Sequence, residues 1–172
     1  NITGGLEWLT SLNGGAGGLA YSDPAGVWTW NPSSNAWTAR GALNGLGSFH
    51  TWIVAAGGFA YFGGGSEPAS TKMYRMDASG NVTTAPSTPI AAGISAGIVL
   101  RHPDGNQLLL FAQGTSGPMY RFDGTSWINQ GTHQIGGLDR LWFGVPIREY
   151  GIIVFVSQSG DNAQPLAKIY KP

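Results

Sequence analysis

The sequence has no cysteine, few charged residues and no long apolar run. The absence of cysteine excludes disulfides and thiolate metal sites. Nine Lys and Arg residues balance nine Asp and Glu residues, and charged residues make up only 10% of the chain, against roughly 25% in ordinary soluble domains. Because the basic residues are few and scattered, we expect no binding to nucleic acid. No apolar run approaches the roughly 18 residues of a membrane span, so we expect none.

Glycine is abundant, at 28 of 172 residues, and there are ten prolines. Both residues interrupt helices, so the chain cannot be mainly helical. With so few charges, the surface must be built from Ser, Thr, Asn, Gln and Gly. This composition favours an extracellular protein or a structural assembly, and the low charge leaves little repulsion against self-association. The chain begins at Asn1 and not at Met, so we expect a processed or excised product.

One short motif occurs four times, at residues 27–31, 73–77, 119–123 and 169–171. Its aromatic anchors are Trp28, Tyr74, Tyr120 and Tyr170, which are 46, 46 and 50 residues apart. A period of this size indicates a stack of similar supersecondary units, each of which buries its apolar face against a neighbour.

Each unit contains short apolar segments separated by turn residues, as expected for antiparallel strands. We predict strands at 18–22, 27–30, 37–39, 50–56, 59–62, 72–76, 82–85, 98–101, 107–111, 119–122, 127–129, 141–145, 152–156 and 168–170. Four such strands in about 46 residues are typical of one propeller blade. The sequence therefore predicts an all-β fold, a β-propeller of about four four-stranded blades in a single domain over 1–172. The repeat units are roughly 13–40, 48–86, 94–130 and 138–172, and the last unit lacks its outer strand.

The N-terminal segment 6–12 fits two positions in such a fold. Its Trp-containing pattern resembles the outer strands at Trp37 and Trp127, which favours pairing beside Tyr170 to close the ring. Closure of this kind would remove exposed sheet edges. Alternatively, the segment is the inner strand of the first blade, and the fourth blade then lacks a partner.

The glycine pairs at 57–58 and 63–64 surround an apolar strand, and the aromatic anchor Tyr74 follows them. This pattern resembles the kelch repeat, which implies a propeller of the kelch type. Kelch propellers usually have more than four blades, so the chain is either a small ring or a propeller segment. Galactose oxidase-like copper enzymes share such blades, but their site needs a cysteine that is absent here. Residues 123–127 also resemble a partial Asp-box, a structural turn of sialidase-type propellers.

No residue pattern indicates catalysis, a metal site or a cofactor. The histidines His50, His102 and His133 lie in different units without metal-ligand spacing. Asp77, Asp104, Asp123 and Asp161 each lie beside Gly or Asn, where aspartate usually accepts backbone hydrogen bonds. The chain also lacks the G-x-S-x-G pattern of a serine nucleophile. We therefore predict that the protein is not an enzyme.

The candidate binding residues fall in two places. Trp28 and Trp30 alternate on one strand, so both point to the same face and could pack or stack on a sugar. Trp142, Arg148 and Tyr150 accompany Arg140 and Glu149 in the densest charge cluster. Asn1 and Asn81 fit the N-glycosylation pattern.

The sequence thus predicts a non-enzymatic module, extracellular or at the cell surface, with a binding or structural role, whose partner is a protein or a second copy. Three alternatives stay open: a carbohydrate-binding propeller, a self-assembling subunit that shares its N-terminal strand with a neighbour, and a fragment of a larger propeller enzyme.

Overall fold

The computed structural model describes residues 5–23, 25–47, 51–65, 69–92, 97–112, 116–133, 141–158 and 165–172. These residues form strands, turns and two short 3₁₀ turns, η1 (Asn13–Gly15) and η3 (Arg148–Tyr150). The strands make four separate antiparallel sheets, each built from strands that follow one another in the chain. No helix in the described ranges is long and apolar enough to cross a membrane.

The four sheets are the blades of a propeller arrangement, as the repeat predicts. Blade 1 holds β1 (Gly5–Leu9), β2 (Gly18–Asp23), β3 (Gly26–Asn31) and β4 (Ala36–Gly41). Blade 2 holds β5 (Thr51–Ala56), β6 (Phe59–Gly64), β7 (Met73–Met76) and β8 (Val82–Ala85). Blade 3 holds β9 (Gly97–Arg101), β10 (Leu108–Ala112), β11 (Gly117–Phe122) and β12 (Trp127–His133). Blade 4 has three strands, β13 (Leu141–Ile147), β14 (Ile152–Gln158) and β15 (Pro165–Tyr170).

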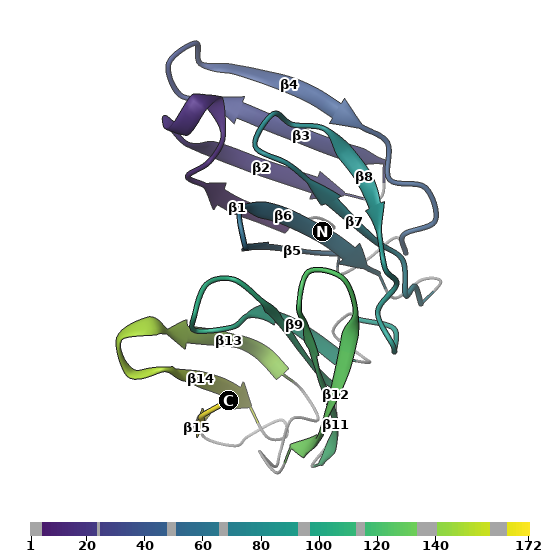
Figure 1. Cartoon of the computed structure of the whole chain (residues 1–172), viewed down its shortest axis with the longest axis vertical. Helices are drawn as coiled ribbons and strands as arrows, with labels where there is room; N and C mark the ends of the chain where they lie inside the picture. Colours follow the sequence, from purple (N-terminus) through teal and green to yellow (C-terminus); the bar gives the residue numbers. More distant parts are fainter. Residues whose placement is uncertain are drawn as a thin grey trace.

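The first strand of each blade lies innermost, and these strands contact one another in the order β1, β5, β9 and β13. Figure 1 shows the first two blades in the upper half of the molecule and the last two in the lower half. Among the described strands, no comparable set of contacts joins β13 back to β1. Blades 1 and 4 are therefore the two ends of the array.

The N-terminal segment does not close the ring. β1 pairs with β2, from Gly5 opposite Ser22 to Leu9 opposite Gly18, whereas the sheet of blade 4 contains only β13, β14 and β15. The interpretation of 6–12 as a closing strand is therefore wrong, and the alternative, an inner strand of blade 1, is confirmed. The physical reason is burial, because Leu9 and Leu12 are almost fully covered in the core between blades 1 and 2. Pairing beside blade 4 would remove both side chains from that core.

Three apolar clusters fill the spaces between successive blades. Alternate residues of a strand point to opposite faces of its sheet, so each inner blade supplies side chains to two clusters. Phe62 packs between blades 1 and 2, and Phe122 packs between blades 2 and 3. Phe111 of blade 3 meets Phe155 and Tyr170 of blade 4 edge to face, with ring centroids 5.0 and 5.3 Å apart. Each blade thus buries its apolar faces only where another blade stands beside it.

Candidate binding surface

Trp28 and Trp30 lie on one face of blade 1, as their alternation predicts. Thr29 between them is buried on the opposite side, where its hydroxyl accepts a 2.7 Å hydrogen bond from Arg40. The Trp28 ring lies 5.8 Å from the ring of Tyr21 on the neighbouring strand. The Trp30 indole N–H donates to the side chain of Asn35 at 3.2 Å. Both rings are half-buried, and these contacts of the described residues all come from blade 1.

The two tryptophans belong to a larger apolar surface, which we call the blade 1 face. Residues that stand directly opposite one another in neighbouring antiparallel strands lie on the same face of the sheet. The strand pairing therefore identifies which residues of all four strands share the face of Trp28 and Trp30. The blade 1 face consists of Leu6, Trp8, Leu19, Tyr21, Trp28, Trp30 and Trp37. Leu6 and Trp37 are 59% and 53% exposed, which is unusual for residues of this size. The exposed side chains of β1 and β4 thus flank the half-buried side chains of β2 and β3, and exposed apolar patches are candidates for interaction sites.

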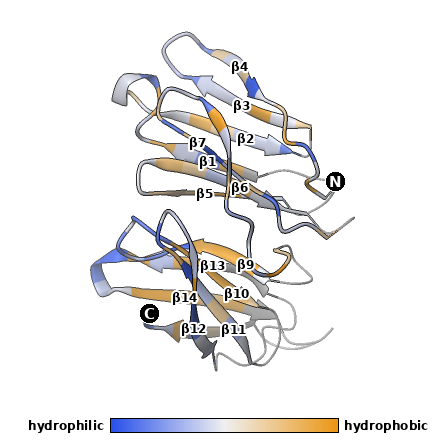
Figure 2. Cartoon of the chain, turned by 45° about the vertical axis from the view of Figure 1, so that its right-hand side comes forward, coloured by the Kyte–Doolittle hydropathy of each residue, from blue (hydrophilic) through white to orange (hydrophobic). Residues whose placement is uncertain are grey.

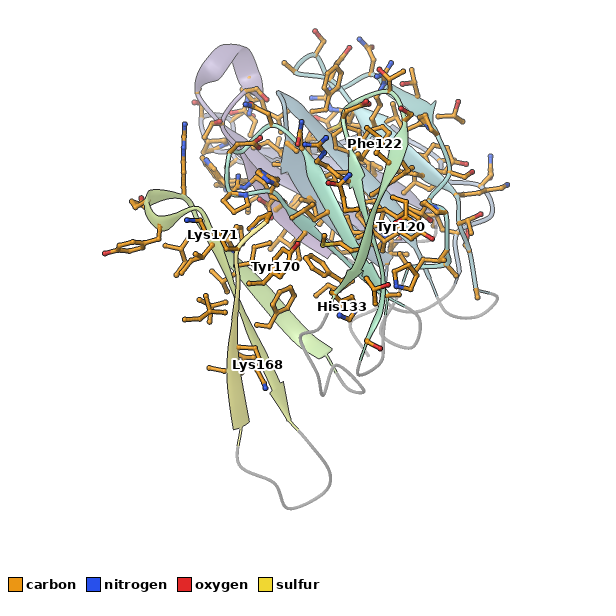
Figure 3. All side chains as sticks on the ribbon, turned by 60° about the horizontal axis from the view of Figure 1, so that its bottom comes forward. Tyr120, Phe122, His133, Lys168, Tyr170 and Lys171 are labelled. Atoms are coloured by element: carbon orange, nitrogen blue, oxygen red, sulfur yellow. The ribbon has the colours of Figure 1, made fainter. Side chains whose placement is uncertain are left out.

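The equivalent surface is covered in the other blades. Trp30 stands 46 residues before Met76, which stands 46 residues before Phe122. Met76 and Phe122 are 0% and 1% exposed because each packs against the preceding blade. Figure 3 labels Phe122 on its strand. Blade 1 has no preceding blade within the described chain, so the same face remains open.

The second group of predicted site residues lies in blade 4, at the connection between β13 and β14. Arg148 and Tyr150 belong to η3, and the Tyr150 side chain is exposed. Arg148 lines a shallow pocket together with Gly151 of blade 4 and with His102 and Asp104 in a turn of blade 3. Trp142 lies in β13, but its side chain and the whole of Arg140 fall outside the described residues. Trp28 and Trp30 lie in blade 1, so the two groups do not form one site.

A smaller pocket of about 160 Å³ lies where the end of β1 meets the β5–β6 and β9–β10 turns. Its lining includes Trp8, Ser11, Phe59 and Arg101. The pocket was not predicted, because its residues come from three blades and share no sequence motif.

Arg101 also acts on the charge of Glu7 on β1. Burial raises the pKa of the Glu7 carboxyl, and the nearby charge of Arg101 offsets part of that increase.

The predicted structural roles of the turn aspartates are visible in their hydrogen bonds. Asp77 accepts backbone N–H groups of Ser79 and Asn81, each at 2.9 Å. Asp123 accepts those of Thr125 and Ser126, at 2.8 and 2.9 Å. Hydrogen bonds favour the ionised carboxylate, so the pKa values of both aspartates lie below their ordinary range. For Asp77 the largest cause is the bond from the Asn81 side-chain amide, and for Asp123 it is the backbone N–H of Ser126. Asp161 lies outside the described residues.

Two of the three histidines make local hydrogen bonds, and His50 lies outside the described residues. The buried His133 ring bonds the carbonyl oxygen of Ala112 through Nε2 at 2.7 Å. His102 accepts the backbone N–H of Asp104 through Nδ1 at 3.1 Å. Within the described ranges, no three His, Asp or Glu side chains gather closely enough to hold a metal ion.

Of the two predicted glycosylation positions, Asn81 lies within the described residues. Asn81 is exposed in the turn before β8, where its amide nitrogen donates to the Asp77 carboxylate at 2.9 Å. A glycan on Asn81 would therefore have to replace this turn contact. Asn1 lies outside the described residues.

Comparisons with solved structures place the chain among propeller folds. No family model matches the sequence, and no curated protein matches it. The structure of YjhT is similar over 85% of this chain and 50% of its own, with 10% identity and a TM-score of 0.54. A chain of the nidogen/laminin complex is similar over 90% of this chain and 60% of its own, with 12% identity and a TM-score of 0.57. The protein therefore spans about half to three fifths of the length of these structures, and the likeness concerns the fold alone.

Proposed function

We propose that the protein is a non-enzymatic, extracellular binding or structural module that binds a protein partner through the blade 1 face. The observation that carries this proposal is the exposure of Leu6, Trp8 and Trp37 around Trp30, whose counterparts Met76 and Phe122 in blades 2 and 3 are buried against another sheet. Aromatic side chains on a flat, prearranged surface are the groups that contribute most to protein interfaces.

Several further observations support the parts of this proposal. The low charge and the Gly-, Ser- and Thr-rich composition favour an extracellular location. The glycine pair at 57–58 forms the β5–β6 turn, in keeping with a kelch-like blade. One of the similar structures is itself a protein complex, of nidogen with laminin. A non-enzymatic role agrees with a sequence that contains no recognisable nucleophile motif.

The test is site-specific photo-crosslinking. A photoreactive phenylalanine analogue replaces Trp37 in one variant and Tyr150, which is exposed outside the blade 1 face, in a matched control. Irradiation in the native mixture should give a discrete protein adduct from position 37 and none from position 150. Equal labelling from both positions, or none from position 37, would contradict the proposal.

A carbohydrate ligand is the second candidate, because Trp30 and Trp37 stand directly opposite each other across β3 and β4. Two neighbouring indole rings offer a platform on which a sugar ring could stack. This function predicts that soluble glycans quench tryptophan fluorescence and that Trp37→Ala reduces the quenching. A protein-binding surface gives no such quenching.

A further inference from the structure

A second open surface lies at the other end of the array, and we call it the blade 4 face. Ile153, Phe155 and Tyr170 of blade 4 pack against blade 3, so the alternate residues of the same strands point away from it. These alternate residues are Val145, Ile147, Ile152, Val154, Val156, Ala167 and Ile169. All of them are apolar, and β13 and β14 are largely orange in Figure 2.

The repeat identifies the blade 4 face as one half of a blade interface. Val27, Met73, Met119 and Ile169 occupy the same position of the motif. The first three pack against the blade that follows, and Met119 is 6% exposed. Ile169 has no following blade among the described residues, and it is 71% exposed. The side chain is apolar at every copy of this position, whether or not the chain itself covers it.

The blade 1 face is the matching half. Trp28, Tyr74 and Tyr120 occupy another shared position, and Tyr74 and Tyr120 pack against the preceding blade. The chain therefore carries, at opposite ends, the two surfaces that meet in each of its three internal interfaces. An interface between two such different surfaces of identical chains is heterologous, and it leads to a closed ring or a longer helical assembly.

We propose that the partner of the blade 1 face is a second copy of this chain, which packs its blade 4 face there and continues the stacking of blades. This inference rests on the proposed function, because it names the protein that the surface binds. Five of the seven large apolar side chains exposed in the described ranges lie on the two faces, namely Leu6, Trp8, Trp37, Val145 and Ile169.

Electrostatics do not oppose this association. The one charged residue in the described rows of the two faces is Asp23 at the end of β2, whose carboxylate accepts a hydrogen bond from the Tyr21 hydroxyl at 3.3 Å. The chain has a formal net charge of zero. Two copies therefore approach without the repulsion that keeps highly charged proteins apart. The similar folds also extend beyond the part that this chain matches, which is 50% of YjhT. A second copy supplies a sheet where those folds have further chain.

Sedimentation equilibrium of the full chain over a range of concentrations tests the proposal. We expect mass to rise from that of the 18.0 kDa monomer to a dimer or larger assembly. Trp37→Lys and Ile169→Lys each place a charge in one face and should raise the dissociation constant at least about tenfold. Both side chains are exposed in the isolated chain, so the monomer should keep its fold, which circular dichroism checks. Ile128→Lys, a control at an exposed apolar position on β12 of blade 3 and outside both faces, should associate like the native chain.

Mixing the two face variants shows which surfaces meet. The Trp37→Lys chain keeps its blade 4 face and the Ile169→Lys chain keeps its blade 1 face, so the mixture should form a 1:1 heterodimer that neither variant forms alone. A native chain that stays monomeric, or a mixture that stays monomeric, would overturn the inference. A variant that associates like the native chain would also overturn it. If the photoreactive analogue at position 37 then crosslinks to a different protein, the proposed function stands without this inference. If it crosslinks to no protein, both the inference and the proposed function are wrong.

Discussion

The backbone N–H of Gly57 donates a 3.1 Å hydrogen bond to the carbonyl oxygen of Gly105, which joins the β5–β6 turn of blade 2 to the β9–β10 turn of blade 3. Gly57 has a φ of +56°, and a Cβ on it would lie 2.9 Å from the backbone oxygen of Asn106. Gly58 also has a positive φ, of +82°, but its Cβ would meet open space. The two glycines therefore share a backbone conformation and differ in their surroundings.

This difference predicts unequal costs for two neighbouring substitutions. Gly57→Ala and Gly58→Ala each place an L side chain in the left-handed region, at a cost of about 1–2 kcal/mol. Gly57→Ala should lose more free energy of unfolding, because its Cβ also pushes apart the two turns that the hydrogen bond joins. Urea denaturation of both variants measures the difference. Equal losses would mean that the contact between the turns contributes nothing.

The repeat position shared by Met119 and Ile169 predicts a second contrast in stability. Met119→Ala opens a cavity between blades 3 and 4 and should cost about 2–5 kcal/mol. Ile169→Ala, at a position 71% exposed, should change the free energy of unfolding by less than about 0.5 kcal/mol. Both are measured by urea denaturation at a concentration where the chain is monomeric. A large loss for Ile169→Ala would indicate that the monomer itself covers the blade 4 face.

The strands and blades could be predicted from the sequence because each strand carries its own pattern of apolar and turn residues. The position of β1 could not. Its Trp8 looks like the outer-strand residues Trp37 and Trp127, and only the burial of Leu9 and Leu12 decides which sheet it joins. That burial depends on a neighbouring blade, which a local pattern does not contain.

The binding surface was predictable only in part for the same reason. The alternation of Trp28 and Trp30 predicts that they share a face, and they do. The addition of Trp8 and Trp37 to that face requires the register of all four strands. Whether another sheet covers the face depends on how many blades stand beside it, so an aromatic residue in the repeat identifies a blade interface without saying whether it is occupied.

The turn that follows β11 predicts a pH-dependent effect. The Asp123 carboxylate accepts two backbone N–H groups, which lowers its pKa below the ordinary value of 3.8. Its contribution to stability is therefore present above about that pH and is lost as the pH falls through the lower folded-state pKa. Asp123→Ala should lower the Tm near pH 7, and its difference from the native chain should shrink toward pH 2.

Thermal melts at several pH values measure this effect. Asp123→Asn is the control, because its side-chain oxygen still accepts the same N–H groups without a charge. It should lose less stability than Asp123→Ala near neutral pH. If the Tm difference between Asp123→Ala and the native chain were the same at all pH values, a role for the ionised carboxylate would be contradicted.

Glu7 predicts an effect of the opposite sign, because burial raises the pKa of its carboxyl above 4.5. The ionised form is then disfavoured in the folded chain, so the cost is absent below about pH 4 and complete above the raised pKa. Glu7→Gln should therefore be more stable than the native chain near pH 7, with a gain that disappears in acid. Since the Arg101 charge partly relieves the cost, Arg101→Gln should destabilise the native chain near pH 7 and have less effect in the Glu7→Gln background. Urea denaturation of the four chains at both pH values checks this, and a Glu7→Gln variant less stable than the native chain near pH 7 would refute it.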